Sequence, residues 1–250
     1  MNLTVYLMRH GQTEPETPWR FLGQRDVALS DKGRARAAAW REALRGVNFA
    51  GAWCSELARS RETAALVLEG RGLAATPVAG LREICLGEWD GLSVADVKRR
   101  YPGLYEARGA DIAGFRPPGG ESFADLSNRA WAALENILAA AGAGPPSREA
   151  GIDASAPAAR AQPAEESDAA GARPAGANQA PGEADADNGA TLLVVAHAGV
   201  NRTIVARLLG MPVENLFRLG QDHGCLNILS FGPGRPRLAR ANLVPGMLPC

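Results

Sequence analysis

The sequence has little of what marks several common classes of protein. Its four cysteines include no C-x-x-C pair, which disfavours both a zinc site and a planned set of disulfides, so we expect free thiols. The 27 Lys and Arg residues balance the 27 Asp and Glu residues, so no global charge attracts nucleic acid or an anionic membrane. Any anion-binding site must therefore be local.

Long apolar runs, a basic leader and metal-ligand spacings are also missing. No apolar stretch approaches the roughly 20 residues of a membrane span, and the first residues carry no basic segment of a signal peptide. These absences predict a cytoplasmic protein with neither a membrane nor a nucleic acid as its partner. The three histidines lack the spacing of metal ligands, so we expect no metal and no other cofactor.

What is present indicates one globular α/β domain over residues 1–250. The chain is 46% hydrophobic, which at this length is enough to bury a core. Apolar runs typical of strands alternate with segments of helical periodicity, and this order predicts a three-layer α/β/α sandwich with a mostly parallel central sheet. The expected strands cover residues 3–8, 50–54, 76–79, 191–196 and 225–231, and the expected helices cover residues 30–44, 57–68, 93–101, 123–141 and 200–209.

Residues 142–190 interrupt this pattern with a different composition. The segment consists mainly of Ala, Gly, Pro, Asp and Glu, and Ile152 is its only large aliphatic residue. Such a segment buries too little apolar surface to offset the entropy lost on ordering. We therefore predict a disordered insertion within the domain, whose role the sequence leaves open.

Two of the three histidines lie where an apolar run gives way to a glycine-containing turn. His10 follows the first expected strand and His197 follows the fourth. Ligands of open α/β sheets gather at such strand ends. Arg9 adjoins the first histidine and Arg59 follows another expected strand, and guanidinium groups carry the fork of donors that suits phosphate oxygens. These residues together indicate phosphoryl transfer through histidine.

Each of these residues fits a step of that chemistry. Phosphoryl transfer needs an in-line nucleophile and positive charge around three equatorial oxygens. A neutral His10 is the candidate nucleophile, with its other ring nitrogen held by a backbone carbonyl of the glycine turn. Arg9 and Arg59 would bind the equatorial oxygens, and His197, if protonated, would add a cationic donor. No metal is then required.

A carboxylic acid must also protonate the leaving alkoxide. Glu83 is the candidate, and Glu88 is the alternative because it lies close by in the sequence. His223 lies in a loop, where it is either a substrate contact or a surface residue, and Arg20 and Arg25 are either solvated charges or contacts to an anionic substrate. Four aromatic residues could form an apolar wall for a bulky leaving group or belong to the core: Trp19, Phe21, Trp89 and Phe115.

Six motifs in order make the sequence resemble the histidine phosphatase superfamily, the phosphoglycerate-mutase-like group, everywhere outside the insertion. They are Arg9-His10-Gly11-Gln12-Thr13-Glu14, Gly23-x-x-Asp26-x-x-Leu29-Ser30-x-x-Gly33, Ser55-x-Leu57-x-Arg59-Ser60-x-x-Thr63-Ala64, Glu83-x-x-x-Gly87-x-x-x-Gly91, Gly119-Gly120-Glu121-Ser122 and Ala196-His197-Ala198-Gly199-Val200-x-Arg202. Any one of them is weak evidence, but all six in this order make coincidence implausible. The resemblance implies the phosphoglycerate-mutase-like fold.

The resemblance also implies the roles of the site residues. His10 would be the phosphorylated nucleophile and Glu83 the proton donor. Arg9, Arg59 and His197 would form the phosphate pocket. For Gln12, Thr13 and Gly23, ordinary turn chemistry is the alternative to a place in the pocket. The expected substrate-binding residues are Arg9, Gly11, Gln12, Thr13, Gly23, Arg59, His197 and Ala198.

Departures from the mutase pattern favour the phosphatase branch of that superfamily. Mutases typically have an arginine directly after the proton-donor glutamate, where this chain has Ile84, and they commonly carry Asn and Ser where it has Glu16 and Leu22. The residue run 87–91 and the Glu-Ile pair resemble α-ribazole phosphatase and other enzymes that hydrolyse small phosphomonoesters. We therefore expect a small phosphorylated substrate. Phosphoglycerate-mutase-type transfer and an inactive module that binds phosphorylated ligands remain alternatives, and the natural substrate and oligomeric state stay open.

Overall fold

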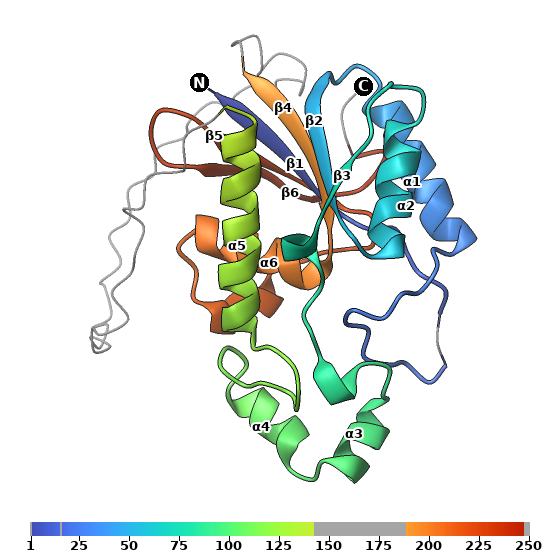
Figure 1. Ribbon diagram of the computed structural model, residues 1–250, viewed down its shortest axis with the longest axis vertical. Coiled ribbons are helices and arrows are strands. Elements are labelled where there is room, and N and C mark those ends of the chain that lie inside the picture. Colours follow the sequence, from blue (N-terminus) through green and yellow to red (C-terminus); the bar gives the residue numbers. More distant parts are fainter. Residues whose placement is uncertain (1, 16, 143–188, 248–250) are drawn as a thin grey trace, which may run out of the picture.

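The computed structural model describes residues 2–15, 17–142 and 189–247. Its centre is a six-stranded sheet with the strand order β3-β2-β4-β1-β5-β6 (Figure 1). The strands are β1 (Leu3–Arg9), β2 (Phe49–Ser55), β3 (Thr76–Val78), β4 (Ala190–Ala196), β5 (Leu226–Phe231) and β6 (Arg237–Leu243). The first four strands are parallel, and β5 runs antiparallel to both of its neighbours. The sheet is therefore mostly parallel, as predicted.

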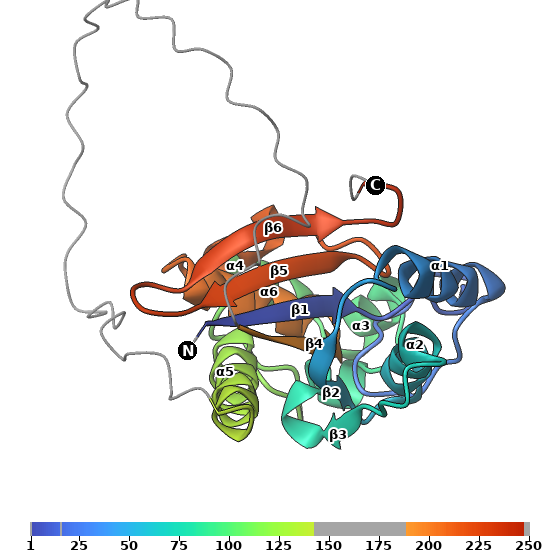
Figure 2. The same ribbon diagram turned by 90° about the horizontal axis from the view of Figure 1, so that it is seen from above.

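Helices cover both faces of this sheet (Figure 2). Consecutive side chains of β4 show why, because residues along a strand point alternately to opposite faces. Leu193 and Val195 pack with helices α1 (Asp31–Ala43) and α2 (Ala58–Leu68). Leu192 and Val194 pack with α5 (Phe123–Ala140) and α6 (Ala198–Leu208). A strand buried on both faces needs a continuous apolar run, which is the pattern seen in its sequence, and the three-layer prediction is confirmed.

Short elements complete the chain. Helices α3 (Val94–Arg100) and α4 (Leu104–Ala110) lie beyond the end of the sheet at which the parallel strands finish (Figure 1). The 3-10 helices are η1 (Ala79–Leu81), η2 (Gly87–Trp89) and η3 (Val213–Arg218). Ser93 and Ser122 begin α3 and α5 with capping boxes, in which each hydroxyl accepts a backbone N–H of the first turn. No helix among the described residues is long and apolar enough to cross a membrane.

The predicted elements agree with the structure to within two residues at each end, and the elements that were not predicted are α4, β6 and the short helices η1, η2 and η3. Helix α4 has no buried residue, so it carries no periodic apolar face, and β6 is an edge strand that is mostly exposed. The predicted insertion at 142–190 lies almost wholly outside the described residues. Of its two ends, Gly142 follows α5 with φ at 83°, and Ala190 already belongs to β4.

Candidate active site

The two strand-end histidines meet because β1 and β4 are adjacent parallel strands. Arg9 is paired in register with Ala196, and the His10 N–H donates to the Ala196 carbonyl at 3.0 Å. The rings of His10 and His197 are both buried, with centroids 5.1 Å apart. His10 Nδ1 lies 2.7 Å from the Gly11 carbonyl oxygen, so Nδ1–H donates to it and Nε2 keeps its lone pair. The predicted hydrogen bond to the glycine turn is therefore present.

The loop after β1 is held by close backbone contacts. The Gly11 N–H donates to Thr63 Oγ1 at 3.0 Å, which ties the loop to α2. A Cβ on Gly33 would lie 2.1 Å from the Gln12 carbonyl oxygen, so only glycine lets the first turn of α1 approach this closely. Ser30 caps α1 and also donates through Oγ to the Gln12 carbonyl at 3.1 Å. His10 is thus fixed from two helices.

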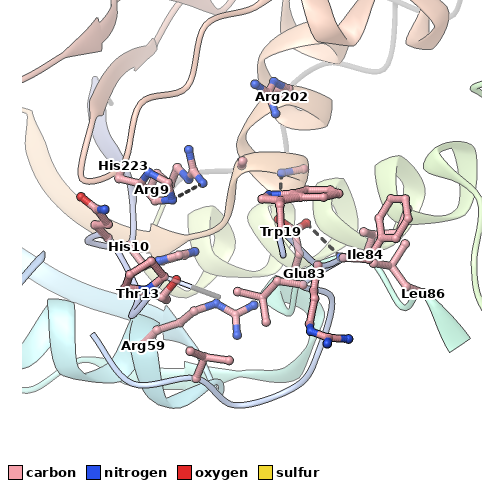
Figure 3. Close-up of a pocket in the computed structure, with 18 of the residues that line it drawn as sticks. Arg9, His10, Thr13, Trp19, Arg59, Glu83, Ile84, Leu86, Arg202 and His223 are labelled. Atoms are coloured by element: carbon pink, nitrogen blue, oxygen red, sulfur yellow. Dashed lines mark hydrogen bonds between the residues drawn. The ribbon is translucent and has the colours of Figure 1, made fainter. Parts of the chain in front are cut away.

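Two arginines flank His10, and each is oriented by backbone carbonyls. Arg59 is 1% exposed, and its two terminal amino groups donate to the carbonyls of Gly23 and Arg25, each at 2.7 Å. Arg9 donates to the Gln221 carbonyl and lies 2.8 Å from His223 Nε2 (Figure 3). The Nε atoms of both arginines are buried without a partner among the described residues. Because buried donors are nearly always paired, these atoms fit an anionic ligand.

Electrostatics keep the histidines neutral. Burial, Arg59 and Arg9 hold the pKa of His10 well below its ordinary value, and burial with the neighbouring His10 does the same for the pKa of His197. Arg59 and Arg9 also lower the pKa of His197, so these surroundings disfavour the protonated form on which a cationic role of His197 would depend. Its Nε2 instead pairs with Ser55 Oγ at 2.8 Å, and Nδ1 has no partner among the described residues.

The structure separates the two candidate acids. The buried Glu83 carboxylate accepts the N–H of Ile84 at 2.9 Å and the N–H of Gly199 at 3.1 Å, and it lines the same cavity as His10. Glu88 is exposed, lies outside that cavity, and accepts the Tyr101 hydroxyl at 2.6 Å. Only Glu83 therefore lies within reach of a substrate bound at His10.

A cavity of about 460 Å³ joins these groups (Figure 3). Seven residues of the predicted site line it: Arg9, His10, Gln12, Thr13, Arg59, Glu83 and Ala198. The other three predicted residues, Gly11, Gly23 and His197, lie behind this surface and act through backbone or ring contacts. No group of three or more His, Cys, Asp or Glu side chains among the described residues could hold a metal ion.

The structure decides between the alternatives that the sequence left open for the aromatic residues and for Arg20 and His223. Trp19 and Phe21 line the cavity, as does Arg20, whereas Trp89 is fully buried in the core and packs against Phe115 at 5.4 Å. The Arg25 carbonyl accepts a hydrogen bond from Arg59. Sequence reasoning left His223 open, and the structure places it at the cavity beside Arg9, where burial lowers its pKa to about 4.

Three further cavity residues received no role from the sequence. Arg202 stands in the last motif, which was the only available signal for it. Arg108 and Phe217 belong to α4 and η3, where no motif marks them. They reach the cavity only through the tertiary fold.

Comparisons with known proteins agree with this geometry. The family model of the histidine phosphatase superfamily (branch 1) matches residues 5–145 and 148–244. The adenosylcobalamin/alpha-ribazole phosphatase of Salmonella typhimurium is 27% identical over 93% of this chain and 92% of its own length. A solved structure of mycobacterial glucosyl-3-phosphoglycerate phosphatase matches with a TM-score of 0.70 at 28% identity, over 97% of this chain and 99% of the other.

A mutase is also among the relatives. The 2,3-bisphosphoglycerate-dependent phosphoglycerate mutase of Methylobacterium radiotolerans is 38% identical over 139 residues, which cover 52% of this chain and 63% of the mutase. The family model, by contrast, extends over nearly the whole chain, and so does the match to the Salmonella phosphatase. The chain therefore belongs to branch 1 of the histidine phosphatase superfamily and is a phosphatase.

Proposed function

We propose that the chain is a cytoplasmic, metal-independent phosphomonoester hydrolase that forms a phosphohistidine on His10. In the first step Nε2 of the neutral imidazole attacks phosphorus, the bond from phosphorus to the ester oxygen breaks, and Glu83 gives its proton to the leaving alcohol. In the second step water attacks the phosphohistidine, Glu83 takes a proton from that water, and inorganic phosphate leaves. Atoms and charges balance without a further reactant.

The hydrogen bond from His10 Nδ1–H to the Gly11 carbonyl carries this proposal. It fixes the tautomer in which Nε2 has the free lone pair, in a site whose charges keep the ring neutral. Arg9 and Arg59 lie on either side with partnerless Nε–H groups, which supply positive charge where the three equatorial oxygens would lie. Since phosphoryl transfer depends on positioning and charge stabilisation, these groups suffice for the chemistry.

The placement of Glu83 supports its role as the acid. Its carboxylate is held by two backbone N–H groups, and its own carbonyl accepts Gln24 Nε2 at 3.0 Å. Arg129 donates to the carbonyls of Gly80 and Arg82, each at 2.9 Å, so the backbone before Glu83 is fixed as well. Because these hydrogen bonds already hold Glu83 in place, little conformational entropy is lost when its carboxyl group is oriented for proton transfer.

The relatives support a small phosphorylated metabolite as the substrate, and their names give two candidates, α-ribazole phosphate and glucosyl-3-phosphoglycerate. The named activity of the Salmonella relative is that of an adenosylcobalamin/alpha-ribazole phosphatase. The cavity walls beyond the histidines include Trp19, Phe21, Leu22 and Ile84, which suit a leaving group with apolar surface.

Phosphate release in excess EDTA tests the mechanism. The panel is α-ribazole phosphate, several sugar phosphates and 3-phosphoglycerate, measured for the wild type, His10→Ala, Glu83→Gln and the matched control Glu88→Gln. We expect release that survives EDTA, is lost with His10→Ala, falls about 10²- to 10⁴-fold with Glu83→Gln and is unchanged with Glu88→Gln. Chemical trapping of a phosphorylated wild type, absent from His10→Ala, would locate the intermediate.

Other results would contradict the proposal. Loss of activity in EDTA would indicate a metal-dependent reaction. Isomerisation of 3-phosphoglycerate that needs a bisphosphate primer, without phosphate release, would indicate a mutase. Binding of phosphorylated ligands without turnover would indicate a recognition module.

A further inference from the structure

Arg108 is a charged cavity residue that forms no ion pair with another residue that the structure describes. It lies in α4, lines the cavity and is partly buried. Its guanidinium carbon is 5.9 Å, 5.8 Å and 6.0 Å from the ring centroids of Phe21, Phe123 and Phe217. It makes no hydrogen bond and no ion pair with another described residue. Burial lowers its pKa, as expected for a cation that is partly removed from water.

Other arginines of the chain meet the cost of burial differently. Arg129 pairs with Glu121, and Arg59 donates to two carbonyls. Stacking on aromatic rings stabilises a cation but leaves its N–H donors without hydrogen-bond acceptors. Because unpaired buried charge is costly, a guanidinium in this position fits an anion that arrives with the ligand.

Arg202 adds a second guanidinium at the same place. It donates through Nε to the Leu219 carbonyl at 2.9 Å, and its guanidinium carbon lies 5.4 Å from the centroid of Phe217. Phe217 therefore contacts Arg202 and Arg108 alike. Neither arginine forms an ion pair with a carboxylate of a described residue, and both line the cavity that contains His10. The aromatic wall thus carries two positive charges.

We propose that Arg108, assisted by Arg202, binds a second anionic group on the leaving alcohol, so that the preferred substrates are phosphomonoesters with a carboxylate or a second phosphate. This proposal rests on the proposed function, because it assigns a binding site to the end of the substrate opposite the phosphate that would be bound at His10. Glu16 and Leu22 stand where mutases commonly have Asn and Ser, and neither suggests such a site in the sequence. The positive charge comes from α4 and α6 instead.

Matched ligand pairs test the proposal. Glycerol 3-phosphate and 3-phosphoglycerate differ by hydroxymethyl against carboxylate, and glycerol 1,3-bisphosphate carries a second phosphate. Phenyl phosphate and its 3- and 4-carboxy derivatives give a longer series. We expect kcat/KM for at least one anionic substrate to be about 10-fold or more above that for its neutral partner. Comparison of 3-phosphoglycerate with glycerol 1,3-bisphosphate then shows whether the site prefers a carboxylate or a second phosphate.

Arg108→Met and Arg108→Lys assign the preference to one residue. Arg108→Met should lower kcat/KM for the preferred anionic substrate about 10-fold more than for its neutral partner, and Arg108→Lys should keep part of the preference. Arg207→Met is the matched control, because Arg207 also stacks on an aromatic ring, Trp131 at 5.1 Å, but lies outside the cavity. The absence of any anion preference, or a preference that survives Arg108→Met, would overturn the proposal.

Binding measured without turnover separates this proposal from the catalytic one. Titration of the same ligand pairs into His10→Ala reports affinity in a chain that lacks the proposed nucleophile. The anion preference should appear in Kd and should vanish in the His10→Ala, Arg108→Met double variant. A wild type without phosphatase activity whose His10→Ala variant still shows this preference would refute the mechanism and leave the second anion site standing.

Discussion

The two ends of the cavity are built on different principles. At the histidine end, defined by Arg9, His10 and Arg59, each side chain extends from the end of a strand or the start of a helix and is held by backbone carbonyls of loops. At the aromatic end, defined by Arg108, Arg202 and Phe217, both guanidinium groups lie against a ring, and Arg202 also donates to the Leu219 carbonyl. Hydrogen bonds to carbonyls fix direction, whereas cation–π contacts are less directional.

This difference matches the parts of a substrate that each end would meet. A phosphate group has one geometry in every phosphomonoester, so a rigid set of donors is suited to it. Leaving groups differ in shape and charge, and the aromatic end can bind several of them because cation–π contacts constrain its guanidinium groups less strictly. Phe217 is 51% exposed although it lines the cavity, which places the aromatic end near solvent. Substitutions at the two ends should therefore have different signatures.

The largest effect should follow from Arg59→Lys at the histidine end. An ammonium group cannot donate to the carbonyls of Gly23 and Arg25 and also to a phosphate oxygen in the fixed geometry of the guanidinium fork. We expect kcat/KM to fall about 10²- to 10³-fold, by a similar factor for every substrate in the panel. Arg202→Lys should instead give factors that differ between leaving groups. If the fold loss in kcat/KM varied across the substrate panel in the same way for both variants, the two ends of the cavity would not be functionally distinct.

A smaller effect should follow from Gly199→Ala, which displaces the Glu83 carboxyl group but does not change it chemically. An added Cβ would lie 2.3 Å from Glu83 Oε1, so the carboxylate must shift. Displacement of a catalytic group by about 1 Å costs up to about 10²-fold, and we expect kcat to fall 10-fold or more with KM little changed. Gly46→Ala is the control, because no atom lies within 4 Å of its added Cβ. An unchanged kcat for Gly199→Ala would argue against Glu83 as the acid.

The smallest effect concerns the titration of His10. Positive charge on Arg59 lowers the pKa of His10, so Arg59→Met should raise that pKa. Since attack requires the neutral ring, the acid limb of the kcat/KM profile should then move to higher pH. Titration of the imidazole by NMR in the wild type and Arg59→Met measures the shift directly, with Arg207→Met as a control for loss of a remote charge. If the acid limb of the kcat/KM profile does not move in Arg59→Met, a group other than His10 determines that limb.

Much of the histidine end could be predicted from the sequence because its residues follow strands. Arg9 with His10, and His197, come directly after apolar runs that only a buried strand explains, and parallel neighbours bring such ends together. The glycine turn after His10 predicted the hydrogen bond that holds its ring. The choice between Glu83 and Glu88 was beyond the sequence, because it depends on which of two nearby carboxylates faces the cavity.

The aromatic residues show the same limit. Trp19 and Trp89 are equally apolar in the sequence, yet the first is 65% exposed and lines the cavity, and the second is fully buried. Helix α4 was not predicted because it buries no residue, and this is the helix that carries Arg108 to the cavity.

The sequence by itself determined the order of most strands and helices, the three-layer class and which histidines and arginines are the candidates for the proposed chemistry, because each depends on local periodicity or on position at a strand end. Only the tertiary structure decided which carboxylate lines the cavity with His10, which rings line that cavity and where two guanidinium groups contact the same ring. Those features join α4, α6 and η3, which are distant in the chain, and contact between a cation and an aromatic ring leaves no fixed spacing in a sequence.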